Sequence, residues 1–169
     1  MRPQRAWIGL GANLGQPLRQ LQSAISALAL LPHTTLEAVA PLYGSAPIGP
    51  ADQPDYLNSA TRISTTLTPH ALLRELQAIE QAHDRVRERH WGPRTLDLDL
   101  LLYAHDVIST PELELPHPEL TRRAFVVLPL LALDPALRLP DGQPVAELAP
   151  TLAGQAIALL APAGWWQGS

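Results

Sequence analysis

Leu96-Asp97-Leu98-Asp99-Leu100-Leu101-Leu102-Tyr103 is the clearest strand in this sequence of 169 residues. Successive side chains of a strand point to opposite faces of its sheet, so we expect the alternate leucines from Leu96 to Leu102 to pack together on one face. Asp97 and Asp99 then lie on the other face, about 7 Å apart along the backbone. Two carboxylates at this spacing can converge on hard cations, and two Mg²⁺ ions could bridge a polyphosphate there. The alternative is an ordinary pair of solvent-facing acids.

The elements before this strand follow a regular order. Apolar residues at helical spacing alternate with strand-like segments, and glycine and proline mark the turns between them. We expect a strand at Ala6–Leu10, a helix at roughly Pro17–Leu31, strands at Thr35–Tyr43 and Tyr56–Leu67, and a helix from the Thr68-Pro69 cap to about Asp84. With the strand at 96–103, this β-α-β-β-α-β order predicts an α+β fold whose ferredoxin-like core is an antiparallel sheet flanked by helices.

The C-terminal part of the chain adds elements to this core. We expect a short strand near Val107-Ile108, an apolar helix at Phe125–Leu133, and a last Ala-rich segment that is either helix or strand. The sequence contains no repeat and no linker, so we expect a single domain over residues 1–169.

Two residue types are absent from the sequence, and their absence excludes several kinds of chemistry. Without cysteine there are no disulfides, thiolate zinc sites, iron–sulfur clusters or cysteine nucleophiles. Without lysine there is neither a Walker P-loop nor a Schiff-base enzyme, and all twelve basic residues are arginines. Any phosphate must therefore be held by arginine, histidine, backbone N–H groups or metal. Many of the arginines can equally be surface residues that reflect only a compositional preference.

Charge and hydropathy indicate a cytoplasmic protein. The net charge of −4 does not indicate a general binder of nucleic acids or anionic membranes. The N-terminal residues lack a long apolar stretch followed by a small-residue cleavage site, and the longest apolar run, Ala124–Leu133, is far too short to span a membrane. We therefore expect neither nucleic acid nor membrane among its partners.

A basic loop, residues 85–95, leads directly into the acidic strand. It holds four arginines, a histidine and Trp91. Arginines can hold phosphate, an aromatic ring can cover a base, and a closing loop can exclude water. The simpler interpretation is a solvated charge run paired with neighbouring acids such as Glu88. The context favours a magnesium-dependent enzyme that moves a phosphate-containing group from ATP.

Three further features have both an ordinary and a functional interpretation. Glu80, near the end of the second helix, could reach a ring or a hydroxyl, but the residues alone favour an exposed helical glutamate. His117 lies between two prolines and could donate to a phosphate, although a lone histidine in a turn more often has no catalytic role. The run Gly9-x-Gly11-x-x-x-Gly15 is one residue too long for a dinucleotide fingerprint, so a Rossmann site is not favoured.

Longer motifs make the sequence resemble a known family. They are Gly9-Leu10-Gly11-Ala12-Asn13-Leu14-Gly15, the segment 49–58, Gln77-x-x-Glu80, Arg85-Val86-Arg87, Trp91-Gly92-Pro93-Arg94-Thr95-Leu96-Asp97-Leu98-Asp99, Pro116-His117-Pro118 and Arg123-Ala124-Phe125. From about residue 6 to about residue 145, the chain resembles the 6-hydroxymethyl-7,8-dihydropterin pyrophosphokinases of folate biosynthesis. The stretch 91–99 is very specific to that family.

The resemblance implies transfer of the β,γ-diphosphate of ATP to the hydroxymethyl group of the pterin, with release of AMP. It implies a catalytic group of Arg85, Arg94, Asp97 and Asp99, in which the two aspartates hold two magnesium ions. The residues implied to contact ATP are Gln77, Glu80, Arg87, Trp91, Leu100, His117 and Arg123, with Arg87 and Trp91 in a mobile lid. The residues implied to contact the pterin are Ser45, Ala46, Ile48, Tyr56, Asn58 and Phe125. A monomer is expected from the same resemblance.

The chain also departs from the family pattern. The loop between Arg85 and Trp91 is one residue shorter than in the best-known members, and Ser45-Ala46 replaces a common Thr-Pro. Glu112 and Glu114 stand where some relatives have basic or polar residues near the nucleotide. Two other functions stay open: a two-metal phosphohydrolase, which would turn over ATP without a pterin, and a nucleotide sensor that binds without turnover.

Overall fold

The structure, a computed structural model, describes residues 2–13, 16–45, 56–84 and 96–167. The main sheet contains β1 (Gln4–Ala12), β2 (Thr34–Val39), β3 (Leu42–Ser45), β4 (Tyr56–Thr65), β5 (Asp97–Tyr103) and β8 (Ile157–Ala161), and a small second sheet contains β6 (Ile108–Ser109) and β7 (Glu114–Leu115). The helices are α1 (Pro17–Ala29), α2 (Pro69–Asp84) and α3 (Ala124–Leu133), with 3-10 segments η1 (Leu120–Arg122), η2 (Val145–Leu152) and η3 (Trp165–Gln167).

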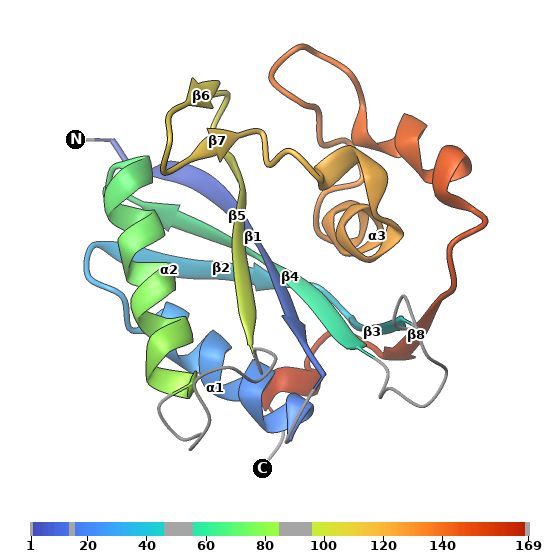
Figure 1. Cartoon of the computed structure of the whole chain (residues 1–169), viewed down its shortest axis with the longest axis horizontal. Coiled ribbons are helices and arrows are strands. Elements are labelled where there is room, and N and C mark those ends of the chain that lie inside the picture. Colours follow the sequence, from blue (N-terminus) through green and yellow to red (C-terminus); the bar gives the residue numbers. More distant parts are fainter. Residues whose placement is uncertain (1, 14–15, 46–55, 85–95, 168–169) are drawn as a thin grey trace.

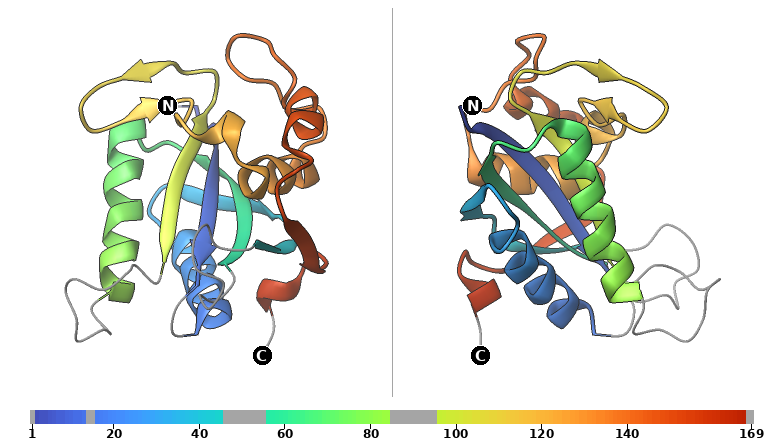
Figure 2. Two further views of the ribbon diagram at one scale, coloured as in Figure 1. Left: turned by 45° about the vertical axis from the view of Figure 1, so that its right-hand side comes forward. Right: turned by 90° about the vertical axis from the view of Figure 1, so that its left-hand side faces the viewer.

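All pairings of the main sheet are antiparallel, and the order across it is β5-β1-β4-β3-β8, with β2 also on β4. With β2 and β3 together in the place of the second predicted strand, the elements from β1 to β5 follow the predicted β-α-β-β-α-β order, so the ferredoxin-like α+β core is confirmed. Helices α1 and α2 cover one face of this sheet, and α3 covers part of the other (Figures 1 and 2). We call these the α1–α2 face and the α3 face.

The strand predicted over 35–43 is two strands, because proline interrupts it. Pro41 has no N–H to donate to a ladder, and β2 ends two residues before it while β3 begins directly after it. Both strands pair with β4, and the Ala40 N–H donates to the Ala60 carbonyl at 2.8 Å in the gap between them. The predicted second strand therefore consists of β2 and β3, which pair with the same strand, β4, on either side of the proline.

The start of α2 has the predicted cap. Thr68 Oγ accepts a hydrogen bond of 3.2 Å from the Ala71 N–H, and Pro69 occupies the first helical position. This cap fixes where the apolar stripe of the helix begins. Leu72 and Leu76 are fully buried as a result, and they face the sheet.

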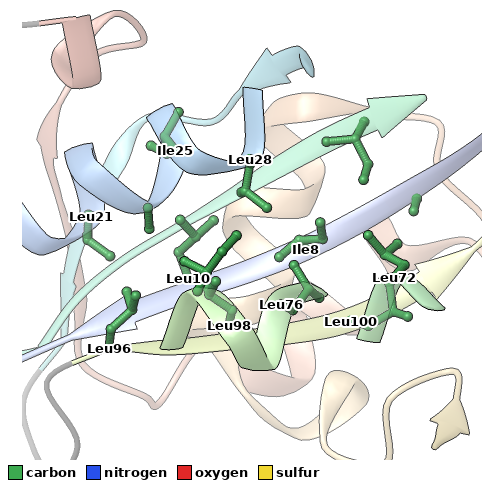
Figure 3. Packing of buried hydrophobic residues seen from close by; sticks show 14 of the residues in the cluster. Ile8, Leu10, Leu21, Ile25, Leu28, Leu72, Leu76, Leu96, Leu98 and Leu100 are labelled. Carbon is green, nitrogen blue, oxygen red and sulfur yellow. The ribbon is translucent and has the colours of Figure 1, made fainter. Parts of the chain in front are cut away.

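The α1–α2 face holds the larger core. Its leucines and isoleucines come from both helices and from β1 and β5, and they interlock along the whole length of the strands (Figure 3). Leu96, Leu98 and Leu100 lie here as predicted, but Leu102 does not. The register between β1 and β5 shifts by one residue between Trp7 and Ile8, so the alternation breaks and Leu102 joins the core of the α3 face.

On the α3 face, an ion-pair network fixes the C-terminal end of α3 to the sheet. Asp134, directly after the helix, accepts hydrogen bonds from Trp7 Nε1 at 2.7 Å and from Arg62 NH1 at 2.6 Å. Arg62 also donates to Glu37 at 3.0 Å. Strands β1, β2 and β4 are thereby joined to one helix terminus, which holds α3 in place above the sheet.

The last segment of the chain contains a strand, which decides between the two predicted alternatives. Strand β8 pairs antiparallel with β3, and η3 returns to pack on α1, where Gln22 Nε2 donates to the Trp165 carbonyl at 3.2 Å. Trp165 Nε1 donates to the Ala40 carbonyl at 2.8 Å. Within the described parts of the chain, no helix is long and apolar enough to cross a membrane.

Candidate active site

Three neighbouring strands form a row across the α3 face in which a glycine lies between two polar residues. Gly11 of β1 stands opposite Asp97 of β5 on one side and opposite Asn58 of β4 on the other. Residues directly opposite each other on paired strands project from the same face of a sheet. With strands about 4.8 Å apart, Asp97 and Asn58 lie about 10 Å from each other across the glycine. The row joins an acid and an amide over a gap that a small ligand can fill.

The glycines of β1 leave the floor of this row without side chains. A Cβ atom on Gly11 would lie 3.3 Å from Nδ2 of Asn58, so the amide group stands directly over the glycine. Gly9 lies one row further along, opposite Asp99. Both glycines lie within a strand of an antiparallel sheet rather than in a phosphate-binding turn, which contradicts the dinucleotide-site alternative.

The two aspartates project from β5 into solvent-accessible space. Asp97 is exposed, and the Asp99 side chain is 43% exposed. The Nε2 atom of His117 lies 3.8 Å from Oδ1 of Asp99. The strand thus presents two carboxylates on one face, as predicted, with an imidazole beside the second.

His117 is held in position by its backbone and by its ring. Its N–H donates to the Leu101 carbonyl on the outer edge of β5 at 3.0 Å, and the Leu115–Pro116 peptide bond before it is cis. Nδ1 accepts a hydrogen bond of 3.1 Å from the Glu119 N–H. Because Nδ1 is the acceptor, the proton of the neutral ring is on Nε2, the atom that faces Asp99.

Glu80 is buried rather than exposed, so the interpretation from the residues alone was wrong. Only 8% of its surface is accessible, and its Oε2 atom accepts a hydrogen bond of 2.7 Å from the Leu98 N–H. Leu98 lies between the two aspartates on β5, and no strand of the described residues pairs with the outer edge of β5. The carboxylate of Glu80 therefore satisfies an edge N–H and ties α2 to the part of β5 that carries Asp97 and Asp99.

A cavity of about 280 Å³ opens at the outer edge of β5, next to this arrangement. It is lined by Leu73, Leu98, Asp99, Leu100, Thr110, Pro111, Glu112, Leu113, Glu114, His117 and Pro118. Three residues implied by the family resemblance, Asp99, Leu100 and His117, therefore share one cavity. The two glutamates that depart from the family pattern also line it. Gln77, which is exposed on α2, does not.

The polar side chains at the other end of the row form a second cluster. Ser45 and Asn58 are buried, and the Ser45 hydroxyl donates to Oδ1 of Asn58 at 2.7 Å. This bond fixes the amide so that Nδ2 is the group over Gly11. Tyr56 stands opposite Ser45, and Tyr43 stands opposite Asn58. Burial raises the pKa of the Tyr43 hydroxyl above its ordinary value.

Phe125 and Arg123 lie at the N-terminal end of α3. The guanidinium carbon of Arg123 lies 5.4 Å from the centre of the Phe125 ring, a cation–π contact, and Nε lies 3.9 Å from Oε2 of Glu119. Because α3 packs on β3 and β4, both residues belong to the wall above that end of the sheet. Predicted residues that fall outside the described parts of the chain are Ala46, Ile48, Arg85, Arg87, Trp91 and Arg94.

Several lining residues were not predicted as site residues. Gly9 and Gly11 were considered only as part of a phosphate-binding turn, although isolated glycines inside a strand are a signal for close approach of a ligand. Leu73, Thr110 and Pro111 gave no local signal, because only the packing of α2 and the β6–β7 sheet against β5 brings them to the cavity.

The donor groups suit magnesium. Among the described residues, no three His, Cys, Asp or Glu side chains gather closely enough to hold a metal ion together. Asp97 and Asp99 supply two carboxylates, and Mg²⁺ characteristically takes one or two carboxylates together with phosphate oxygens and water.

Comparison with known proteins agrees with this arrangement. The family model of 7,8-dihydro-6-hydroxymethylpterin-pyrophosphokinase (HPPK) matches residues 7–135. The chain belongs to this family. It is 50% identical over 145 residues to the 2-amino-4-hydroxy-6-hydroxymethyldihydropteridine pyrophosphokinase of Pseudomonas aeruginosa, covering 86% of this chain and 90% of that protein. It is 44% identical over 157 residues to the enzyme of the same name from Haemophilus influenzae, covering 93% of this chain and 98% of that one.

Solved structures share the HPPK fold with this chain. The crystal structure of an HPPK-DHPS in complex with substrates superposes with a TM-score of 0.69 at 10% sequence identity. The match covers 89% of this chain but 43% of the solved one, so this chain spans less than half of that protein. The match supports the fold alone.

Proposed function

We propose that this HPPK transfers the β,γ-diphosphate of ATP to the hydroxymethyl group of 6-hydroxymethyl-7,8-dihydropterin, giving AMP and the pterin diphosphate of folate biosynthesis. Membership of the family makes the chain an ATP-dependent diphosphokinase. The single observation that carries the proposal within the structure is the row Asp97–Gly11–Asn58. The carboxylate of Asp97 and the oriented amide of Asn58 lie on either side of Gly11, which has no side chain, and the cavity lies beside the β5 end of the row.

The acidic end of the row suits the polyphosphate. Asp97 and Asp99 would hold magnesium, and we propose two ions, which would neutralise the charge of the phosphates and of the oxygens between which the group passes. His117 presents its Nε2–H beside Asp99, where a phosphate oxygen can accept it. Such a transfer depends on alignment and charge neutralisation more than on a strong base, and the described residues supply no activated nucleophile.

The cavity beside β5 suits the nucleoside. The cavity has a volume of about 280 Å³, and Leu73, Leu98 and Leu100 form its apolar walls. Its polar groups lie at the rim, which includes Thr110 and Glu112. An adenosine group placed there would direct its phosphates past His117 toward Asp99. Glu112 and Glu114 add negative charge to that rim and lower its attraction for further phosphate oxygens.

The amide end of the row suits the pterin. Asn58 is fixed by Ser45, so its Nδ2 is a directed donor for a ring nitrogen or oxygen. Phe125 supplies an aromatic surface on the opposite wall, and Tyr56 supplies another on β4, so a flat bicyclic ring can stack between them. The hydroxymethyl group would then extend along Gly11 toward Asp97, where the diphosphate arrives.

The test is a coupled assay with purified protein, Mg²⁺, ATP and 6-hydroxymethyl-7,8-dihydropterin that quantifies AMP and pterin diphosphate. We expect AMP and pterin diphosphate in equal amounts, and only when the pterin is present. Release of ADP or AMP without pterin would instead identify a phosphohydrolase. Nucleotide binding without turnover would identify a sensor.

We propose a cytoplasmic monomer with small-molecule substrates and no nucleic-acid or membrane partner, on the basis of the net charge of −4 and the resemblance to the family. Sedimentation at micromolar concentration tests the oligomeric state. A dimer at that concentration would contradict it.

A further inference from the structure

The C-terminal segment, residues 155–167, contacts both walls of the site proposed for the pterin. It lies beyond residues 7–135, which the family model matches. Strand β8 of this segment lies beside β3 at the edge of the main sheet, and the chain reaches it from the region of α3 (Figure 1). One wall of the site is β3 with β4, and the other is the N-terminal end of α3.

The contact with the first wall runs along β3. Ile157 of β8 stands opposite Ser45, the residue that orients Asn58. On the other face, the side chain of Leu160 packs against Gly44 so closely that a Cβ atom there would lie 2.8 Å from Cδ1 of the leucine. Without β8, β3 would be an edge strand of four residues, so β8 holds Ser45 in the sheet.

The contact with the second wall is made by Gln155, just before β8. Its Oε1 atom accepts a hydrogen bond of 2.8 Å from the Ala124 N–H, and its Nε2 atom donates to the Arg122 carbonyl at 2.7 Å. The first N–H groups of a helix have no partner within the helix, and the residue at the N-cap of α3, Arg123, makes no side-chain cap. Gln155 therefore caps α3 from a distance and fixes the turn that carries Arg123 and Phe125.

The far end of the segment is anchored to the sheet and to α1. Trp165 Nε1 donates to the Ala40 carbonyl at 2.8 Å, and Gln22 Nε2 donates to the Trp165 carbonyl at 3.2 Å. The segment is thus tied at Gln155, along β8 and at Trp165. A segment attached at three places keeps the distance between β3 and the N-terminal end of α3 fixed.

We propose that residues 155–167 set the separation between the two walls of the pterin site, with Gln155 as the positioning residue for Phe125. This inference rests on the proposed function. Gln155 does not line the cavity beside β5. Its loss should therefore act on the pterin more than on ATP, which it can reach only through Arg123, and a general loss of folded protein would not produce that difference.

The test compares three variants of the full chain: Gln155→Ala, Gln155→Glu and Gln143→Ala. Gln143 is the matched control, because its side chain is exposed in a turn distant from α3. Gln155→Ala loses two hydrogen bonds that act on the pterin only through the position of Phe125, so we expect the KM for the pterin to rise about fivefold while the KM for ATP changes less than about twofold. Gln155→Glu keeps the acceptor for the Ala124 N–H but replaces the donor to the Arg122 carbonyl with a second oxygen, so we expect a rise in the KM for the pterin that is smaller than that of Gln155→Ala.

Two results would overturn the inference. One is a Gln155→Ala enzyme whose KM for the pterin equals that of Gln143→Ala. The other is a parallel rise in both KM values together with a lower Tm, which would show a general loss of folded protein. If Gln155→Ala does not fold, the Gln155→Glu enzyme decides alone: a raised KM for the pterin with an unchanged KM for ATP supports the inference, and a KM for the pterin equal to that of Gln143→Ala contradicts it. Failure of the proposed function is separate, because wild-type protein would then form no AMP that depends on pterin.

Discussion

On the α1–α2 face of the sheet, leucine and isoleucine side chains fill the space along the whole of β1 and β5, whereas on the α3 face this packing stops partway. Beyond the end of α3, the same two strands carry Asp97, Asp99, Gly9 and Gly11. The alternation of a strand thus gives one sheet a closed face and an open face. The closed face contributes most of the buried apolar core, and the open face carries the proposed site.

The difference has a physical basis. A row that must accept a charged ligand cannot bury its acids, because an unpaired buried carboxylate is costly. The folding free energy must therefore come from elsewhere, and the closed face supplies it through fully buried residues such as Ile8, Leu72 and Leu76. Substitutions on the two faces should accordingly separate into those that lower activity and those that lower stability.

The largest effect is expected on the open face, for Asp97→Asn. Removing one carboxylate at the proposed magnesium site should reduce kcat by about a thousandfold, or about 4 kcal/mol, because transition-state charge is left uncompensated. The Tm should change little, since Asp97 is exposed. The control is Glu147→Gln, an exposed carboxylate on η2, for which we expect full activity. Retention of more than about a tenth of wild-type kcat in Asp97→Asn would contradict a role as metal ligand.

The closed face should show the opposite pattern, and Leu76→Ala tests it. Leu76 is fully buried, so the substitution should lower the free energy of unfolding by about 3 kcal/mol through lost contacts and a cavity. Chemical denaturation measures this change. At a temperature where the variant stays folded, kcat should remain within about twofold of wild type. A large fall in the kcat of fully folded Leu76→Ala would show that the two faces do not separate stability from activity.

A smaller effect is expected at the amide end of the row. Asn58→Ala removes the directed donor and should raise the KM for the pterin about tenfold, equivalent to about 1.4 kcal/mol. Ser45→Ala leaves the amide in place but removes the bond that orients it, so its effect should have the same sign and be several times smaller. Steady-state kinetics at varied pterin concentration check both. Equal effects on ATP and pterin binding would argue against a pterin site at Asn58.

The smallest effect is expected at the start of α2. Thr68→Ala removes the hydroxyl that caps the helix and should lower the free energy of unfolding by about 1 kcal/mol. Activity at moderate temperature should be unchanged, since the cap lies at the opposite end of α2 from Glu80. Thr68→Ser keeps the hydroxyl and should restore most of the loss. If Thr68→Ser is as unstable as Thr68→Ala, the hydroxyl is not the stabilising group.

Local patterns predicted the parts of this fold that depend on local chemistry. The alternation of 96–100, the cap at Thr68 and the element order are properties of neighbouring residues, and the structure confirms them. Leu102 was placed on the wrong face, because a register shift depends on the partner strand. Glu80 was expected to be exposed, because nothing in a helical pattern shows that a strand edge lies beside it.

The candidate site was predicted by residue type but not by arrangement. The acids and His117 stood out from spacing and from the family motifs, and the cavity brings Asp99 and His117 together. The alignment of Asp97, Gly11 and Asn58 depends on the register of three strands far apart in the sequence. No periodicity within one segment carries that information.

The proline break between β2 and β3 has a consequence for local opening. Hydrogen exchange reports opening in contiguous cooperative units, and a ladder interrupted at Pro41 no longer forms one such unit. β3 is paired with both β4 and β8, whereas β2 is paired with β4 alone. Amide protons of β3 and β8 should therefore exchange together, at a rate different from those of β2.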